Sequence, residues 1–239
     1  MKREIILFDL DGTLLPIEMN SFLKRYFSLL TAEFVDIAEA DLFAGYIYTA
    51  TMDMINNNGE KYNEQVFRES FFKQVEVDDR EDILRRFDRF YQEEFPTLKP
   101  ELPVDPTSAR LVNLLKQAGY QLILATNAVF PREAIEERMN WAGLNPADFL
   151  YITNYSNMHY CKPNLNFYQE IVEQTKIVPD QCIMIGNDMQ EDMIAGKLGM
   201  ATYLVTDYLI DRGADSERFY PDWTGSSAEL LSHFENKLT

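Results

Sequence analysis

The chain of 239 residues has few cysteines and histidines, and its positive charges are far fewer than its negative ones. The two cysteines, Cys161 and Cys182, form no framework of disulfide spacings. The first apolar run, in MKREIILFDLDG, ends at Asp9 after only a few residues. That is too short for a signal peptide or a membrane span, so we expect a cytoplasmic protein without a membrane partner.

The shortage of positive charge limits the possible partners. Lys and Arg number 22 against 39 Asp and Glu, which gives a formal net charge of −17. Such a surface repels nucleic-acid phosphates, so we expect no nucleic-acid partner. It also repels phosphorylated small molecules, and a bound divalent cation would reverse the field locally. Most of these carboxylates need no role beyond keeping the protein in solution.

Most of the chain alternates between apolar strands and amphipathic helices, which predicts an α/β fold with a parallel sheet. The continuous apolar run within residues 4–9 is typical of a buried parallel strand. Further strands are predicted at 121–126, 149–152, 181–186 and 201–205. The predicted helices between and after them are 131–142, 165–175, 189–198 and a final helix with a capping-box pattern at Ser226 and Glu229.

Residues 17–98 have a different pattern. Apolar residues recur there at helical spacing, Gly and Pro are scarce, and no strand pattern occurs. Three prolines, at 96, 100 and 103, then suggest a boundary. We therefore expect a helical cap domain of residues 17–98 inserted into an α/β core formed by residues 1–16 and 99–239.

The first predicted strand leads into Asp9-Leu10-Asp11-Gly12-Thr13. Two carboxylates placed two residues apart at a strand end can face one cleft, and Gly12 lets the backbone turn away at once. By itself this pattern also fits an ordinary turn or a calcium-like loop.

Three further polar groups follow later strands. The hydroxyl of Thr126 and the backbone at Asn127 can hold a phosphoryl oxygen, and Lys162 can neutralise a phosphate or a carboxylate. Asp188 and Asp192 suit a hard cation with oxygen ligands. Each feature also has an ordinary explanation. Thr126 and Asn127 fit a polar loop, Lys162 fits a solvated surface lysine, and Asp188 and Asp192 fit acidic capping of a helix N-terminus. Because ligands bind at the carboxyl ends of strands in open α/β sheets, the four features together indicate one site.

In this order, the four features resemble the motifs of the haloacid dehalogenase superfamily of aspartate-nucleophile hydrolases. The motifs span residues 9 to 192, and the helical segment stands where that superfamily carries a cap. The resemblance implies a Rossmann-like, doubly wound parallel sheet with an inserted all-helical cap, and Mg²⁺ as the cofactor.

The resemblance also implies a role for each matching residue. Asp9 is the nucleophile and Asp11 the general acid and base. Thr126 and the backbone at Asn127 bind the transferring phosphoryl group. Lys162 steadies the negative charge that Asp9 and the phosphate share. Cys161 is interpreted as a packing residue.

The metal ligands implied by the resemblance are Asp188, the Asp9 carboxylate and the Asp11 backbone carbonyl, while Asp192 orients the metal shell. Many relatives carry an aspartate directly after the glycine of the fourth motif, where this chain has Asn187. We favour Asp188 as the direct ligand, and the division of roles among Asn187, Asp188 and Asp192 stays open.

The family's dehalogenases lack an acid two residues after the nucleophile, and its pumping ATPases have Thr there. Asp11 therefore favours a Mg²⁺-dependent phosphatase that hydrolyses a small-molecule phosphate monoester through an aspartyl-phosphate on Asp9. One alternative is a phosphomutase, favoured weakly by basic cap residues such as Lys24 and Arg25 if they face the cleft. A second alternative is a non-catalytic phospho-accepting or binding module. The oligomeric state cannot be read from the sequence.

Overall fold

The computed structural model describes residues 4–99, 106–213 and 220–238. The prolines at 100 and 103 that suggested a boundary lie outside these ranges. Within the described residues, no helix has both the length and the apolar character needed to cross a membrane.

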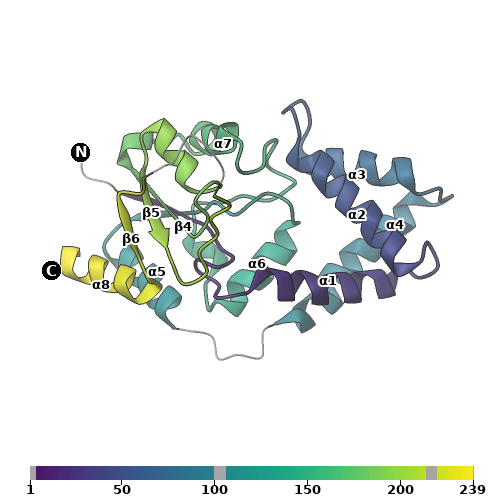
Figure 1. Cartoon of the computed structure of the whole chain (residues 1–239), viewed down its shortest axis with the longest axis horizontal. Coiled ribbons are helices and arrows are strands. Elements are labelled where there is room, and N and C mark those ends of the chain that lie inside the picture. Colours follow the sequence, from purple (N-terminus) through teal and green to yellow (C-terminus); the bar gives the residue numbers. More distant parts are fainter. Residues whose placement is uncertain (1–3, 100–105, 214–219, 239) are drawn as a thin grey trace.

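Six parallel strands form one sheet in the order β3-β2-β1-β4-β5-β6 (Figure 1). Strand β1 (Ile5–Phe8) lies in the centre, between β2 (Gln121–Leu124) and β4 (Cys182–Gly186). Strand β3 (Tyr151–Ile152) flanks β2, and β5 (Ala201–Val205) and β6 (Trp223–Gly225) follow β4. The predicted parallel α/β fold is confirmed, and β6 is a strand that the sequence analysis did not predict.

Helices cover both faces of the sheet, which explains why β1 is apolar throughout. Ile6 and Phe8 pack with α5 (Thr107–Gln117), α6 (Arg132–Trp141) and α8 (Ser227–Leu238). Ile5 and Leu7 pack on the other face with α7 (Leu165–Thr175) and with a 3₁₀ helix at Met193–Leu198. Successive strand residues point to opposite faces, so a strand buried on both faces has no polar position. Short 3₁₀ turns occur at Pro146–Asp148 and Pro179–Gln181.

The structure differs from the sequence prediction after β4. We predicted a helix over 189–198, but only a 3₁₀ helix at Met193–Leu198 forms. The backbone N–H groups of Gln190 and Glu191 donate to the Asp188 carboxylate, and that of Met189 donates to the Ile210 carbonyl. The Asp188 carboxylate thus caps the turn as a helix N-cap residue does, but 3₁₀ bonding from Met193 follows this turn in place of a regular α-helix.

The segment 17–98 is all helical, as predicted. It contains α1 (Met19–Glu33), α2 (Ala40–Ile55), α3 (Asn63–Gln74) and α4 (Arg80–Arg89), followed by a π-helical turn at Phe90–Glu94 and a 3₁₀ turn at Phe95–Leu98. Stacked and edge-on aromatic pairs fill its interior, such as Phe34 and Phe43 with ring centroids 4.7 Å apart. The division into a core and a cap domain stays a prediction.

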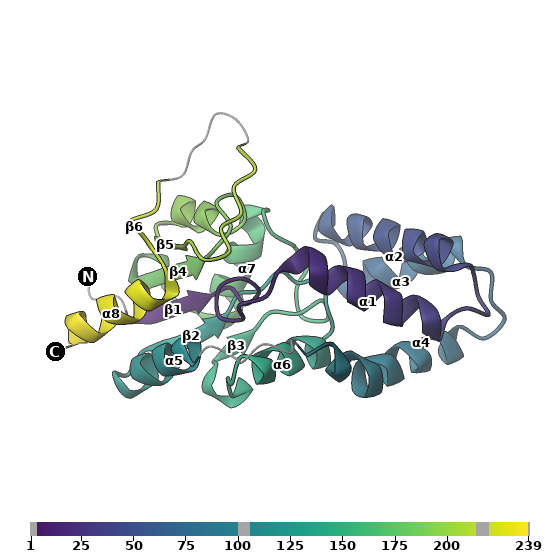
Figure 2. The same ribbon diagram turned by 60° about the horizontal axis from the view of Figure 1, so that its bottom comes forward.

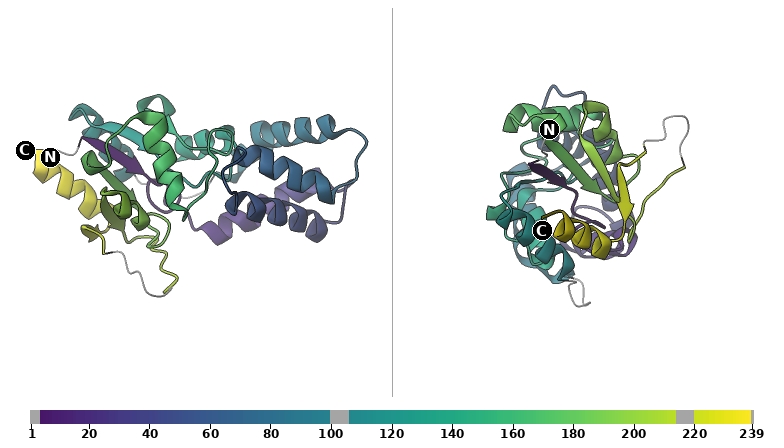
Figure 3. Two further views of the ribbon diagram at one scale, coloured as in Figure 1. Left: turned by 90° about the horizontal axis from the view of Figure 1, so that it is seen from above. Right: turned by 90° about the vertical axis from the view of Figure 1, so that its left-hand side faces the viewer.

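These helices form one end of an elongated molecule. In Figures 2 and 3, α1–α4 lie beyond one end of the sheet, while both chain ends lie at the opposite end. Asn63, at the start of α3, is buried and fastens this segment to the loops of the sheet. Its side chain donates to the Ala128 carbonyl at 3.2 Å, and its backbone N–H donates to Met158 at 2.9 Å. The carboxyl ends of the strands therefore meet the helices.

Candidate active site

Asp9 directly follows the central strand β1, and its backbone N–H donates to the Ile185 carbonyl of β4 at 2.9 Å. Gly12 then turns the chain with a φ of +80°. A Cβ at this position would clash with the side chain of Asn187, so the turn needs glycine for space as well as for conformation. Thr13 Oγ1 donates to Asn187 Oδ1 at 3.1 Å. The first and fourth motifs are therefore in contact.

A buried lysine joins two aspartates. Lys162 Nζ donates to Asp9 Oδ1 at 2.9 Å and to Asp192 Oδ1 at 2.6 Å, and all three side chains are buried. The second oxygen of Asp192 accepts the Asp188 backbone N–H at 3.0 Å. The Asp192 carboxylate lies so close to Gly186 that any Cβ there would collide with it. Asp192 thus supports Lys162 and the turn after β4.

Burial and charge together set the protonation of this cluster. Burial raises the pKa of Asp9 above its ordinary value, and it raises the pKa of Asp192 to about 6, although Lys162 opposes both shifts. Burial works to lower the pKa of Lys162, but the carboxylates of Asp192 and Asp9 hold it well above its ordinary value. Lys162 is therefore charged, and with both aspartates ionised the cluster carries one net negative charge.

Asp188 lies at the start of the turn after β4. Its Oδ1 accepts the backbone N–H groups of Gln190 and Glu191, each at 2.9 Å. Arg212 Nη1 contacts both carboxylate oxygens of Asp188, at 2.8 and 2.7 Å, and Arg212 Nη2 lies 3.2 Å from Glu191 Oε1. The carboxylate is thereby fixed in orientation and kept near a positive charge.

The second motif contacts both the third and the fourth. Asn127 Oδ1 accepts the Lys162 backbone N–H at 3.1 Å, and Asn127 Nδ2 donates to Glu191 Oε2 at 3.2 Å. Thr126 is buried, and its carbonyl accepts the Thr153 hydroxyl at 2.6 Å. Because these contacts join loops that follow different strands, the four motifs form one connected unit.

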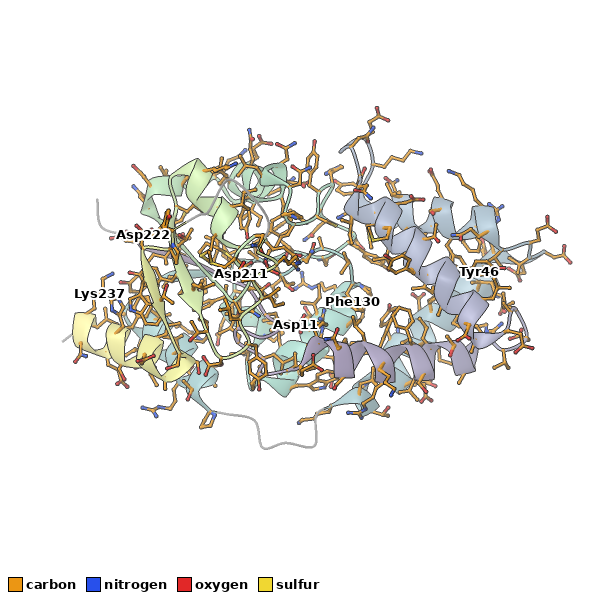
Figure 4. The ribbon with its side chains drawn as sticks, in the orientation of Figure 1. Asp11, Tyr46, Phe130, Asp211, Asp222 and Lys237 are labelled. Atoms are coloured by element: carbon orange, nitrogen blue, oxygen red, sulfur yellow. The ribbon has the colours of Figure 1, made fainter. Side chains whose placement is uncertain are left out.

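Asp11 forms an ion pair with Arg138, which lies on the buried face of α6. The guanidinium of Arg138 stacks over the Phe130 ring, with its carbon 4.5 Å from the ring centroid. Arg138 Nη2 and Asp11 Oδ1 are both buried without a hydrogen-bond partner. Figure 4 shows Asp11 and Phe130 where the sheet meets the helical segment. The pair therefore holds unused hydrogen-bonding capacity at the site.

One cavity of about 330 Å³ adjoins most of these groups. The residues of the sequence-predicted site that line it are Asp9, Asp11, Thr126, Asn127, Asp188 and Asp192. Lys162 is not a lining residue, but it contacts Asp9, which is. The fold thus brings together all seven residues that the four motifs singled out.

The donors around the cavity fit a magnesium ion. Within the described residues, no three His, Cys, Asp or Glu side chains gather closely enough to form a ligand cage. Mg²⁺ needs no such cage, because it commonly binds one or two carboxylates and completes its shell with water and substrate phosphate. The carboxylates of Asp9 and Asp188 line the same cavity and supply hard oxygen donors. Asp192 instead contacts Lys162 and the Asp188 backbone.

Sequence reasoning missed two arginines at this site. Arg138 could have been found from the sequence, because it shares a helix face with Ala134, Ile135 and Met139, all of them buried. A charged residue on an otherwise apolar helix face requires a buried partner. No local pattern in the sequence indicates the role of Arg212, since it lies in a loop 24 residues from Asp188.

Replacing Arg138 by Met should destabilise the protein by roughly 3 kcal/mol, because the change leaves Asp11 partly buried without its cation. Urea unfolding monitored by circular dichroism would measure the loss. Arg132→Met, on the exposed side of the same helix, removes the surface pair with Glu136 and should change the unfolding free energy by less than about 1 kcal/mol. Equal losses in the two variants would contradict the buried pairing.

Cys161 should resist alkylation in the folded protein. Its thiol is buried, accepts a hydrogen bond from Asn63 at 3.2 Å, and has a pKa that burial raises to about 12. The thiolate is the reactive form, and at pH 8, far below this pKa, nearly all of the group is protonated. Intact-mass analysis with iodoacetamide should show an unmodified Cys161 in the native state and modification after unfolding. Rapid native labelling of this residue would contradict the packing interpretation.

Comparisons with known proteins bear on the family and the fold of this chain. The phosphoglycolate phosphatase of Vibrio vulnificus is 26% identical over 95% of this chain and 94% of its own length. A HAD-hydrolase of Bacillus subtilis bound to magnesium is 19% identical with a TM-score of 0.57, covering 98% of this chain and 99% of its own. The L-2-haloacid dehalogenase of Xanthobacter autotrophicus is 14% identical with a TM-score of 0.58 and the same coverage. Residues 4–199 match the haloacid dehalogenase-like hydrolases, and the chain belongs to this family.

Proposed function

We propose that this hydrolase is a Mg²⁺-dependent phosphatase that cleaves a small-molecule phosphate monoester through a covalent aspartyl-phosphate on Asp9. The observation that carries the proposal is the position of the Asp9 carboxylate. It lies at the end of the central strand, held by Lys162 at 2.9 Å, in a cavity shared with Asp11, Thr126 and Asp188. The activity of the phosphoglycolate phosphatase relative supports a phosphate ester as the substrate.

In the first step, a carboxylate oxygen of Asp9 attacks phosphorus, and the bond from phosphorus to the ester oxygen breaks. The leaving alkoxide takes a proton from Asp11. Mg²⁺, held by the carboxylates of Asp9 and Asp188, would neutralise part of the phosphate charge and fix the in-line geometry. Asp9 needs no general base, because its carboxylate is the nucleophile in its ionised form.

In the second step, a water molecule attacks the phosphorus of the aspartyl-phosphate and gives a proton to Asp11. The bond from phosphorus to Asp9 breaks, which releases inorganic phosphate and restores the carboxylate. The guanidinium of Arg138 contacts the Asp11 carboxylate. Arg138 thus positions Asp11 for this proton transfer.

Three groups act on the negative charge of the transferring phosphoryl group. Lys162 contributes a fixed ammonium beside Asp9, and Asp192 holds that ammonium in place from the other side. The Thr126 hydroxyl and the backbone at Asn127 supply neutral donors. Because these groups are anchored before substrate enters, they need little rearrangement when charge develops.

A phosphomutase would use the same nucleophile and the same acid and base. The feature that would favour it was a basic residue at Lys24 or Arg25 facing the cleft. Both residues are exposed on α1 and lie outside the cavity lining. Assaying free phosphate against isomerised sugar phosphate separates the two activities. Mg²⁺ binding without turnover of any ester would favour the non-catalytic module instead.

Asp9→Asn should abolish phosphate release, because the amide is a poor nucleophile. Asp11→Asn should slow the release from alkyl esters by roughly 10²- to 10⁴-fold, the usual contribution of general acid–base catalysis. With an aryl ester, whose leaving group needs no proton, Asp11→Asn should accumulate phosphate on Asp9, which intact-mass analysis detects. Asp180→Asn, an exposed control, should retain activity. Wild-type turnover by Asp9→Asn would refute the mechanism.

Mg²⁺ should raise the melting temperature of the wild type, since a ligand that binds the folded state stabilises it by about 2.7 kcal/mol at a concentration of 100 Kd. Asp188→Asn should lose most of this gain, while Asp180→Asn should keep it. Acidification should weaken the gain, because burial raises the pKa of Asp9 and protonation then removes a ligand at a higher pH than for an exposed aspartate. Differential scanning fluorimetry at pH 7.5 and pH 5 tests both points. An undiminished shift in Asp188→Asn would exclude Asp188 as a ligand.

A further inference from the structure

The cavity at Asp9 and Asp11 extends into the helical segment, where its walls are mainly apolar. Side chains from all four of the helices α1–α4 contribute, together with Phe130 from the loop after β2. The apolar residues from these helices that line it include Leu23, Phe27, Ile47, Phe67, Leu84 and Phe87. A site with apolar walls and a few polar groups at one end is typical of small-molecule pockets, which start at about 300 Å³. The polar end holds the phosphate chemistry, so the apolar walls face the leaving group.

The arginines that line this cavity are already paired. Arg68 forms an ion pair with Glu64 at 2.5 Å, Arg138 with Asp11, and Arg212 with Asp188 at 2.7 Å. Among the described lining residues, six acids outnumber these three arginines. One of the acids, Asp88 on α4, lies in the helical part. Each arginine is thus balanced by a carboxylate, and a leaving group with its own carboxylate would enter a pocket whose described lining carries an excess of acids.

Neutral polar contacts are available along the same walls. The hydroxyls of Tyr26 and Tyr91 lie 2.9 Å apart, and both residues line the cavity together with Thr51. These groups can accept or donate a hydrogen bond without carrying charge. They would tolerate a hydroxyl or carbonyl substituent on an otherwise apolar molecule.

From these observations we infer that the substrate is the phosphate monoester of an uncharged, largely apolar alcohol that bears a ring. This inference rests on the proposed phosphatase function and names its substrate class. It separates this chain from its phosphoglycolate phosphatase relatives, because the leaving group of phosphoglycolate is a small carboxylate. The apolar walls of the cavity complement a ring, and among its described lining residues the excess of acids over arginines disfavours a carboxylate.

The first test compares three alkyl esters with the Mg²⁺-loaded wild type. 2-Phenylethyl phosphate and ethyl phosphate have leaving alcohols of similar reactivity, so a difference between them reports the ring. We expect kcat/KM for the phenylethyl ester to exceed that for ethyl phosphate by about 10- to 100-fold, the value of burying one aromatic ring. Phosphoglycolate should be the poorest of the three. A kcat/KM for phosphoglycolate above that for the phenylethyl ester would overturn the inference.

The second test changes the charge of the wall. Leu23→Arg places an unpaired cation at a half-buried lining position, whereas Ser28→Arg adds the same charge at an exposed position of the same helix. Leu23→Arg should raise kcat/KM for phosphoglycolate by about 10-fold and lower it for the phenylethyl ester. Ser28→Arg should change neither value appreciably. Equal responses of the two variants would show that the wall does not select the leaving group. The circular dichroism spectrum of Leu23→Arg, compared with that of the wild type, shows whether the variant folds. The first test needs no variant.

Measuring ester binding to the inactive variant Asp9→Asn tests the apolar pocket separately from the proposed phosphatase activity. Calorimetry with Mg²⁺ should show tighter binding of the phenylethyl ester than of ethyl phosphate, without any turnover. Selective binding combined with no phosphate release by the wild type would reject the phosphatase proposal and support the apolar pocket. Phosphate release combined with equal binding of the two esters would support the phosphatase and reject the pocket.

Discussion

The contact on which the site depends is the buried ammonium of Lys162 between the carboxylates of Asp9 and Asp192. A charge taken out of water costs several kcal/mol unless it is paired, so each member of this cluster requires the others. The cluster also joins the chain after β1, the loop before α7 and the turn after β4. A single buried interaction thus fixes the relative positions of three segments that lie far apart in the sequence.

The parallel sheet makes this cluster possible. All strands of a parallel sheet end at the same edge, and β1 lies in the centre between β2 and β4. Asp9 therefore has the second motif on one side and the fourth on the other. The sheet itself is apolar and buried on both faces, so the polar groups gather where the strands end.

The helical segment supplies the apolar walls of the site. Its aromatic side chains stabilise its own interior, with Phe34, Phe43, Phe71 and Phe87 packed against one another. Phe87 and further side chains from the same helices also line the cavity. The family resemblance covers the chemistry at the strand ends, which depends on a few motif residues. In the proposed reaction the leaving group would meet the helical walls, whose composition is a property of this chain. A shared catalytic centre and a different substrate are therefore compatible.

The sequence by itself determined the strand pattern, the all-helical segment and the position of each motif after its strand, because burial periodicity and strand-ending turns are local properties. It failed after β4, where a capped turn and a 3₁₀ helix at Met193–Leu198 stand in place of the predicted helix. Only the tertiary structure decided the partners of the charges. Arg138 meets Asp11 across 127 residues, and Arg212 meets Asp188 across 24, and no local pattern encodes such distances. The pairing of buried charges depends on which elements pack together, and that is settled when the whole chain folds.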